Sequence, residues 1–256
     1  MCMLLKDKVI LVVGAGGLLG REIVHAVVRE GGQVVAADVD ADLLKPLADE
    51  LGQDSVLPVR MDITDKSSIE QVFEIAEETW GEVTGAVNTA YPRNKNYGRK
   101  ALEVTYEDFC ENVSLHLGGY FLFMQQCAVY SQKRNIEFSL VNMSSIYGSI
   151  APRFDIYNKT DMTMPVEYAA IKSAVQHTTS YYNAYMKGVP FRANCVSPGG
   201  IENGQPANFL KAYRDKSRIK GMLSCDDVLG AVIYLLSDLS KYVVSQNIVV
   251  DDGFSK

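Results

Sequence analysis

The chain has 256 residues, a length that fits a single α/β domain, and its 47% hydrophobic and 22% charged residues are typical of a globular protein rather than a disordered one. It contains no run of about 18 apolar residues, the minimum for a transmembrane helix. The formal charge of −6 and the lack of a basic stripe exclude an electrostatic surface for nucleic acid.

The N-terminal segment Met1 to Lys8 leads directly into a strand-like run and carries no signal-peptide pattern, so we expect a cytoplasmic protein. The five cysteines lack the spacing of metal ligands, and we expect reduced, buried thiols. The three histidines form no cluster, so we expect no metal site. The residues concerned are Cys2, Cys110, Cys127, Cys195, Cys225, His25, His116 and His177.

Short β-branched runs alternate with segments that have apolar residues at helical spacing, a pattern typical of βαβ units. The expected strands are Val9–Val13, Val34–Ala37, Gly85–Asn88, Ser139–Met143, Phe191–Val196 and Asn247–Val250. The expected helices are Leu19–Glu30, Leu43–Leu51, Ser67–Thr79, Tyr106–Lys133, Val166–Lys187 and Asp226–Ser237. We therefore predict an α/β fold of the Rossmann type, a doubly wound parallel sheet with helices on both faces. Residues 1–256 are expected to form a single domain, with substrate loops at about 91–100, 148–165 and 200–220.

A glycine-rich segment, Gly14 to Gly20, joins the first strand to the first helix. Glycine lets the backbone approach a pyrophosphate closely, and the free N–H groups of a helix N-terminus attract its charge. A tight turn with no ligand is the alternative, but the place of the segment in the first βαβ unit favours dinucleotide binding. Gly14, Gly17, Leu19 and Gly20 are the expected contacts.

Asp38 follows the second strand and lies 18 residues beyond Gly20. An acidic residue at about this offset hydrogen-bonds the adenosine ribose of NAD in Rossmann folds. The next residue, Val39, supplies no positive charge for a 2′-phosphate. We therefore expect NAD as the cofactor, with NADP less favoured.

Tyr168 and Lys172 lie four residues apart at the start of a predicted helix, so their side chains share one face. A phenol with a pKa near 10 is a poor proton shuttle at neutral pH, and a nearby ammonium favours its ionised form. The pair is a candidate for acid/base catalysis.

These motifs, in this order, resemble those of the short-chain dehydrogenase/reductase superfamily over the whole chain. The matching segments are Gly14–Gly20, Asp62-Ile63, Asn88-Thr89-Ala90-Tyr91, Val141-Asn142-Met143-Ser144-Ser145, Tyr168 with Lys172, Ser197-Pro198-Gly199, and Val250-Asp251-Asp252-Gly253.

The resemblance implies a role for each matching position. Ser145 would hydrogen-bond the reacting oxygen, Tyr168 would be the acid/base, and Lys172 would bind the nicotinamide ribose and lower the pKa of the tyrosine. The other implied cofactor contacts are Asp62, Ile63, Asn88, Ala90, Pro198, Gly199, Ile201 and Asn203.

The chain departs from the family pattern in several places. The glycine loop has the form GxxGxxG, which is more similar to the sugar-nucleotide-modifying branch, and Asn203 replaces a usual threonine. The helix motif VNL matches Val113-Ser114-Leu115, so the resemblance puts Ser114 where a catalytic Asn normally holds a water of the proton relay. Ser114 is thus a fourth candidate catalytic residue.

Ser145 and Tyr168 are 23 positions apart, which leaves an unusually long loop between them. Together with Ala90-Tyr91-Pro92-Arg93 and Ser114, this loop resembles the flagellin-modification protein A group of bacterial dehydrogenases, associated with nonulosonic sugar biosynthesis. We expect both long loops to offer polar groups to a sugar-derived hydroxyl or ketone. The candidate polar residues are Arg153, Asp155, Tyr157, Asn158, Lys159 and Asp161, with Arg93, Asn94, Lys95, Asn96 and Tyr97 in the other loop. A solvated surface loop is the alternative.

The leading hypothesis is an NAD(H)-dependent oxidoreductase that acts on a small sugar-derived substrate. A sugar-nucleotide epimerase or dehydratase is a second possibility, although only 56 residues follow Gly200 and leave little room for a substrate domain. A non-catalytic NAD-binding protein is a third, but it would not need Tyr168. The resemblance also implies a homotetramer or homodimer.

Overall fold

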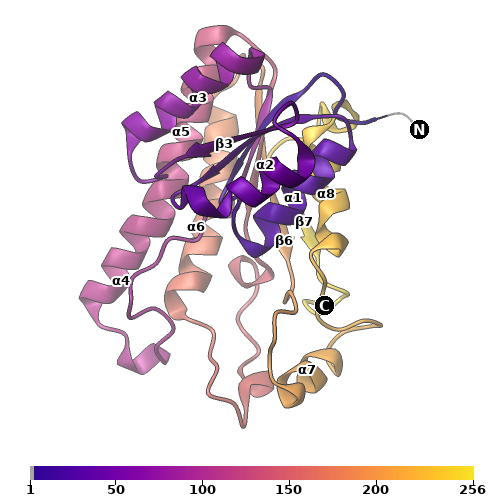
Figure 1. The fold of residues 1–256 in the computed structure, drawn as a ribbon. Coiled ribbons are helices and arrows are strands. Elements are labelled where there is room, and N and C mark those ends of the chain that lie inside the picture. Colours follow the sequence, from indigo (N-terminus) through magenta and orange to yellow (C-terminus); the bar gives the residue numbers. More distant parts are fainter. Residues whose placement is uncertain (1–2) are drawn as a thin grey trace.

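The computed structural model describes residues 3–256, and Cys2 lies outside them. These residues form a parallel sheet of seven strands in the order β3-β2-β1-β4-β5-β6-β7 (Figure 1). The strands are β1 (Val9–Val13), β2 (Gln33–Asp38), β3 (Val56–Arg60), β4 (Gly85–Asn88), β5 (Phe138–Met143), β6 (Phe191–Pro198) and β7 (Asn247–Val250). The predicted doubly wound α/β fold is confirmed.

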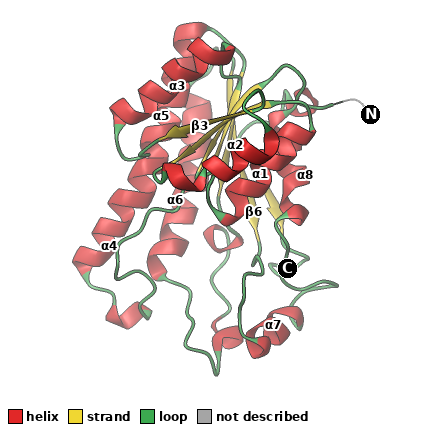
Figure 2. Ribbon diagram, in the orientation of Figure 1, coloured by secondary structure: helices red, strands yellow, loops and turns green. Residues whose placement is uncertain are grey.

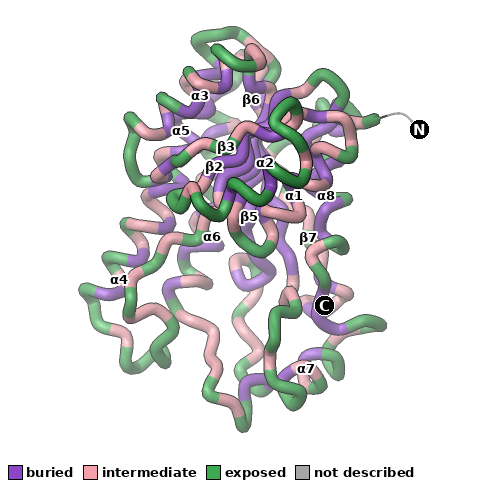
Figure 3. The backbone as a smooth tube through the Cα atoms, in the orientation of Figure 1, coloured by how far each residue is buried: buried purple, intermediate pink, exposed green. Residues whose placement is uncertain are grey.

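Helices cover both faces of the sheet (Figure 2). Helices α1 (Leu18–Arg29), α2 (Lys45–Leu51) and α8 (Asp226–Leu236) pack on one face. Helices α3 (Lys66–Trp80), α5 (Gly118–Arg134) and α6 (Val166–Tyr185) pack on the other. Because both faces are covered, β1, β4 and β5 are buried along their whole length, as Figure 3 shows for the centre of the sheet.

Three elements differ from the sequence-based expectation. The strand β3 was not among the expected ranges, and α7 (Ala207–Arg214) lies within the region expected to be a loop. The single helix expected over residues 106–133 is divided into α4 (Tyr106–Asn112), a π-helical turn over Val113–Leu117, and α5. A π turn accommodates an extra residue, so the side chains after it are rotated relative to a continuous α-helix.

The strand order reverses between β1 and β4, whose carboxyl ends lie side by side. In open α/β sheets, ligands bind in the crevice at such a switch point. The segment of α7 and the loop before α6 extend beyond this edge, at the bottom of Figure 1. The carboxyl edge is therefore the place to look for a site.

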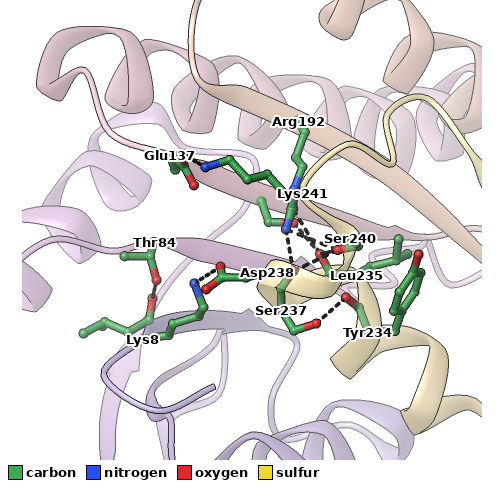
Figure 4. Close-up of polar contacts among 12 residues, drawn as sticks. Lys8, Thr84, Glu137, Arg192, Tyr234, Leu235, Ser237, Asp238, Ser240 and Lys241 are labelled. Carbon is green, nitrogen blue, oxygen red and sulfur yellow. Dashed lines mark hydrogen bonds and ion pairs between the residues drawn. The ribbon is translucent and has the colours of Figure 1, made fainter. Parts of the chain in front are cut away.

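At the amino edge of the sheet, Arg192 on β6 holds the end of α8 (Figure 4). Its guanidinium donates to the carbonyl oxygens of Leu235 at 3.1 Å and of Ser237 at 2.9 Å, and Lys8 forms an ion pair with Asp238 at 2.7 Å. The last carbonyls of a helix have no partner within the helix, and a cation there offsets the negative end of its dipole. This network ties α8 to the sheet far from the carboxyl edge.

The thiols behave as expected only in part. Cys127 and Cys195 are buried, whereas Cys225 is half-buried and Cys110 is exposed. Among residues 3–256, no three His, Cys, Asp or Glu side chains lie close enough together to hold a metal ion. Within the same range, the helices are all too short or too polar to cross a membrane.

Candidate active site

The glycine-rich turn after β1 is shaped by close backbone contacts. Gly14 has φ of +75°, and a Cβ atom on Gly20 would lie 2.1 Å from the carbonyl oxygen of Gly14. Gly17 is the N-cap of α1 and provides no capping side chain, so the first N–H groups of the helix are free. This geometry fits a pyrophosphate group, which such N–H groups and the helix dipole bind.

Asp38 at the end of β2 organises the same turn. One carboxylate oxygen accepts a hydrogen bond from the backbone N–H of Gly16 at 3.0 Å, and the other accepts from that of Asp40 at 3.1 Å. Val39 beside it is exposed. The carboxylate therefore lies at the carboxyl edge near the glycine turn, the position expected of a ribose ligand.

Some of the residues expected to contact the adenine side of the cofactor already form hydrogen bonds within the protein. The carboxylate of Asp62 accepts hydrogen bonds from Thr64, and Ile63 is buried. Asn88 is buried, and its Oδ1 accepts from the N–H of Ala90, whereas its Nδ2 has no partner among the described residues. Asn88 thus keeps a free donor at the switch point between β1 and β4.

A cavity of about 730 Å³ lies beside these residues. It is lined by the N-terminal turn of α1, the segment after β5, the start of α6 and the segment after β6. The predicted site residues that line it are Gly17, Leu19, Gly20, Ala90, Ser145, Tyr168, Lys172, Pro198, Gly199, Ile201 and Asn203. Gly14, Asp38, Asp62, Ile63 and Asn88 are not part of its lining.

Ser145 and Tyr168 are neighbours on the wall of the cavity. Ser145 follows β5, is buried, and accepts a hydrogen bond from the N–H of Tyr147 at 3.2 Å. Burial raises the pKa of Tyr168, and its hydrogen bond with Ser145 lowers this pKa in part. The phenol is therefore protonated at neutral pH, which suits a proton donor.

Lys172 lies one helical turn from Tyr168, with its Nζ 5.6 Å from the centre of the tyrosine ring. The Nζ donates to the carbonyl oxygen of Met143 at 2.7 Å and contacts the hydroxyl of Tyr120 at 3.5 Å. Burial lowers the pKa of Lys172 to about 7. Burial therefore opposes the expected lowering of the tyrosine pKa in two ways: it raises the pKa of the phenol itself, and it disfavours the charged form of the lysine.

The structure does not bring Ser114 to the site. Ser114 is exposed on the π turn and does not line the cavity. His116 is buried behind the cavity wall and does not itself line the cavity: its ring centre lies 5.1 Å from that of Tyr91, which does, and 5.2 Å from that of Tyr120. Neither ring nitrogen of His116 has a hydrogen-bond partner in the described part of the chain.

Burial lowers the pKa of His116 to about 2, and the charges of Lys172 and Arg93 act in the same direction. The imidazole is therefore neutral, with one donor and one acceptor nitrogen. Sequence reasoning gave His116 a helix-face or core role and did not consider Tyr120. The pattern Leu115-His116-Leu117 fits the apolar–polar–apolar motif as well as Val113-Ser114-Leu115 does, but the sequence does not decide between them.

The inserted loop after Ser145 borders the cavity, but its charged side chains do not face the cavity as expected. Asp155 pairs with Lys216 at 2.9 Å, and the Arg153 guanidinium donates to the carbonyl oxygen of Lys256 and stacks over Phe254. Its charged side chains therefore fix the loop to the rest of the protein. The loop residues that do line the cavity are Tyr157, Met162, Thr163, Met164 and Pro165.

A small hydrophobic cluster supports this wall. It joins the loop to α7 and to the C-terminal segment, and its ring stack of Tyr213 on Phe254 has a centre distance of 4.1 Å. The Tyr213 hydroxyl oxygen also accepts a hydrogen bond from the backbone N–H of Gly200 at 2.6 Å. The buried members are Ile146, Tyr147, Ile156, Tyr157, Phe209, Tyr213, Met222 and Phe254.

Comparison with known proteins agrees with this geometry. The family model described as enoyl-(acyl carrier protein) reductase matches residues 14–255. A Rossmann sheet with a glycine turn and a Ser–Tyr–Lys group on one cavity defines an oxidoreductase class, and this chain belongs to the short-chain dehydrogenase/reductase family.

Among its relatives, the chain is 35% identical to the post-translational flagellin modification protein A of Campylobacter coli, over 98% of this chain and 99% of that protein. It is 29% identical to the 3-oxoacyl-[acyl-carrier-protein] reductase FabG of Thermotoga maritima, over 98% and 99% of the two chains. A crystal structure of a short-chain dehydrogenase from Leptospira borgpetersenii with bound NAD+ superimposes with a TM-score of 0.83 at 28% identity, over 98% of this chain and 94% of that one.

Proposed function

We propose that this enzyme transfers a hydride between NAD(H) and a hydroxyl or ketone group of a small, sugar-derived substrate. The observation that carries the proposal is the convergence of Ser145, Tyr168 and Lys172 on the cavity that also receives the free N-terminus of α1. When bound, the nicotinamide supplies or accepts the hydride. The residues of the chain handle the proton.

In the reducing direction, the Tyr168 phenol donates its proton to the oxygen of the substrate carbonyl, and the Ser145 hydroxyl hydrogen-bonds the same oxygen. In the oxidising direction, the same two groups act in reverse. Lys172 stays fixed by the Met143 carbonyl beside the tyrosine ring, where its remaining hydrogens are available to a cofactor hydroxyl. Ser145 and Lys172 are buried beside the half-buried Tyr168, and a substrate that covers this phenol would keep water from competing for the proton.

The preference for NAD over NADP rests on Asp38. Its carboxylate would repel a 2′-phosphate and can accept hydrogen bonds from ribose hydroxyls. The solved relative from Leptospira borgpetersenii contains NAD+, which agrees with this assignment.

A sugar-derived substrate is supported by the lining of the cavity. Aromatic side chains with phenolic hydroxyls, Tyr147 and Tyr157, occur there together with the side-chain amides of Asn203 and Gln205. Such a site offers flat apolar faces and hydrogen-bonding groups at once. The flagellin modification protein among the relatives points the same way.

Loops 91–100, 148–165 and 200–220 of a single domain would form the substrate walls in this proposal. Residues from all three segments, such as Arg93, Met164 and Phe209, line the cavity.

The proposed assembly is a homodimer or homotetramer. Tyr181 and Tyr185 on α6 are 61% and 74% exposed and stack on each other, which suits an aromatic contact between copies. Light scattering of the wild type and of the variant Tyr185→Glu tests this: a monomeric wild type would contradict the proposal.

The test of the activity is a panel of sugars and sugar phosphates, with steroids and simple alcohols for comparison, followed by NADH absorbance. We expect turnover of sugar derivatives only, and a loss of about 10²- to 10⁴-fold in kcat for Tyr168→Phe. Absorbance changes that persist in Tyr168→Phe, or a preference for steroids, would contradict the proposal.

A further inference from the structure

The cavity contains an unusual distribution of charge. Its lining includes the basic residues Arg93 and Lys172, whereas no Asp or Glu of residues 3–256 belongs to it. The protein as a whole has a formal charge of −6. The positive cavity is therefore a local property and does not follow from a generally basic surface.

The two basic groups differ in what they can bind. Lys172 is held by the Met143 carbonyl and the Tyr120 hydroxyl, and burial lowers its pKa to about 7. Arg93 forms no ion pair with any carboxylate within the described range. Its guanidinium is thus the positive charge that remains available to a ligand in the cavity.

Arg93 is also close to the reacting groups. Its guanidinium carbon lies 4.8 Å from the ring centre of Tyr91, and the Tyr91 ring packs edge-on against the Tyr168 ring at 5.7 Å. The Tyr91 hydroxyl bonds that of Tyr97 at 2.7 Å, which fixes the intervening ring. One aromatic ring therefore separates the cation from the proposed proton donor.

The loop that carries Arg93 is held by the residue after it. The backbone N–H of Asn94 donates to Asn112 at 2.9 Å, and its side-chain amide donates to Asp108 at 2.9 Å and to Glu111 at 2.7 Å. Asn112 and Asp108 are both buried on α4. The backbone next to Arg93 is thus held before any ligand binds, which reduces the entropy that this loop loses on binding.

We propose that Arg93 recognises an oxyanion, a carboxylate or a phosphate, on the substrate, at the end of the molecule away from the oxidised carbon. A planar guanidinium forms two parallel hydrogen bonds with either group. The inference rests on the proposed function and narrows its substrate class from sugar derivatives to anionic sugar derivatives. In this proposal the apolar side chains of Met162 and Met164, which also line the cavity, would pack against the sugar ring.

The test uses the enzyme with NADH bound and follows the cofactor fluorescence during titration with three probes: glucose, glucuronate and glucose 6-phosphate. We expect at least one of the two anionic probes to bind about 10- to 100-fold more tightly than glucose, the range for hydrogen bonds to a charged group. The probe with the larger advantage identifies the anion as carboxylate or phosphate.

Three variants locate the effect. Arg93→Met removes the charge but keeps the length of the side chain, and it should abolish the advantage of the anionic probes. Arg93→Lys keeps the charge without the planar fork and should retain part of it. Lys95→Met is the matched control, because Lys95 is exposed on the same loop and does not line the cavity.

Equal binding of all three probes to the wild type, or an anion advantage that survives Arg93→Met, would overturn the inference. The proposed function is tested separately by hydride transfer. Anion binding that depends on Arg93 without NADH turnover of any sugar would contradict the oxidoreductase proposal alone, whereas turnover of neutral sugars that is indifferent to Arg93 would contradict the anion site alone.

Discussion

The Nζ atom of Lys172 lies 2.7 Å from the carbonyl oxygen of Met143, the last residue of β5. This contact joins α6, which carries Tyr168, to the strand that leads into Ser145. Because the lysine is buried, its ammonium has given up hydration and regains one hydrogen bond from the backbone and one weak contact from Tyr120. Its charge state is consequently sensitive to pH.

The pH dependence of stability should reveal this lysine. Burial lowers the pKa of Lys172 from 10.5 to about 7, so between these values the unfolded chain binds one more proton at this position than the folded chain. Unfolding free energy contributed by Lys172 must then rise as the pH increases from 7 to 10. Urea unfolding without cofactor should show the wild type gaining stability over Lys172→Met across this range.

The control for that series is Lys187→Met, at an exposed position two residues beyond the end of α6. It should track the wild type at every pH. A constant difference between wild type and Lys172→Met would show that the folded protein keeps the ammonium protonated throughout.

Cofactor preference should depend on Asp38. We expect NADH to bind more tightly than NADPH. The variant Asp38→Ala should reduce the ratio of the two dissociation constants, because it weakens the binding of NADH and relieves the repulsion of the 2′-phosphate of NADPH. Loss of the bond to the Gly16 N–H should also weaken both cofactors somewhat. Fluorescence titration measures the dissociation constants of NADH and NADPH, and Asp40→Ala, at an exposed position two residues along the chain, serves as the control.

His116 should affect catalysis, and Ser114 should not. The imidazole packs against Tyr91, whose ring packs against Tyr168, and both of its nitrogens are unpartnered among residues 3–256. We expect one of them to hold a water of the proton relay, which Asn can also hold and Phe cannot. We expect His116→Phe to lower kcat by about 10-fold or more and His116→Asn to retain much of the activity, on the scale of a buried hydrogen bond. Ser114→Ala should leave kcat and KM unchanged.

The pH profile of kcat distinguishes a role in proton transfer from a structural one. His116→Phe should shift the profile, whereas a variant that merely loosens the fold lowers the melting temperature and leaves the profile in place. An effect of Ser114→Ala equal to that of His116→Phe would restore the sequence-based assignment.

Arg192 should contribute to stability without affecting catalysis. Its guanidinium satisfies carbonyl oxygens at the end of α8, and Arg192→Met leaves them without that donor. The hydroxyls of Ser139 and Ser240 still donate to these carbonyls, so we expect a loss of about 1–3 kcal/mol in unfolding free energy, the net value of hydrogen bonds from a charged group. The kcat should be unchanged, because the network lies at the amino edge of the sheet. A lowered kcat with unchanged stability would contradict this division.

The parts of the site that the sequence predicts are those set by local spacing. Glycines in a strand-to-helix turn and two residues four apart on a helix keep their relation in almost any Rossmann sheet, so Gly17, Tyr168 and Lys172 fall on the cavity as expected. The π turn is a different matter. Ser114 and His116 are two residues apart, about 200° around a helix, and local spacing does not tell which of them faces inward once a π turn changes the register.

The sequence-based expectation for the charged residues of the inserted loop is wrong for a related reason. Charge alone does not tell which side of a loop faces a ligand, and packing against α7 turned Asp155 toward Lys216 while Tyr157 was buried. That choice depends on tertiary contacts between segments far apart in sequence.

The separate hydrophobic cluster behind the substrate wall bears on how substrate range can change in this family. Because Tyr157, Phe209 and Phe254 share one small core, the inserted loop cannot be exchanged with that of a relative by itself. A chimaera would have to carry the loop, α7 and the C-terminal segment as one unit. Transplanted together, they could bring a new specificity onto an unaltered sheet and cofactor turn.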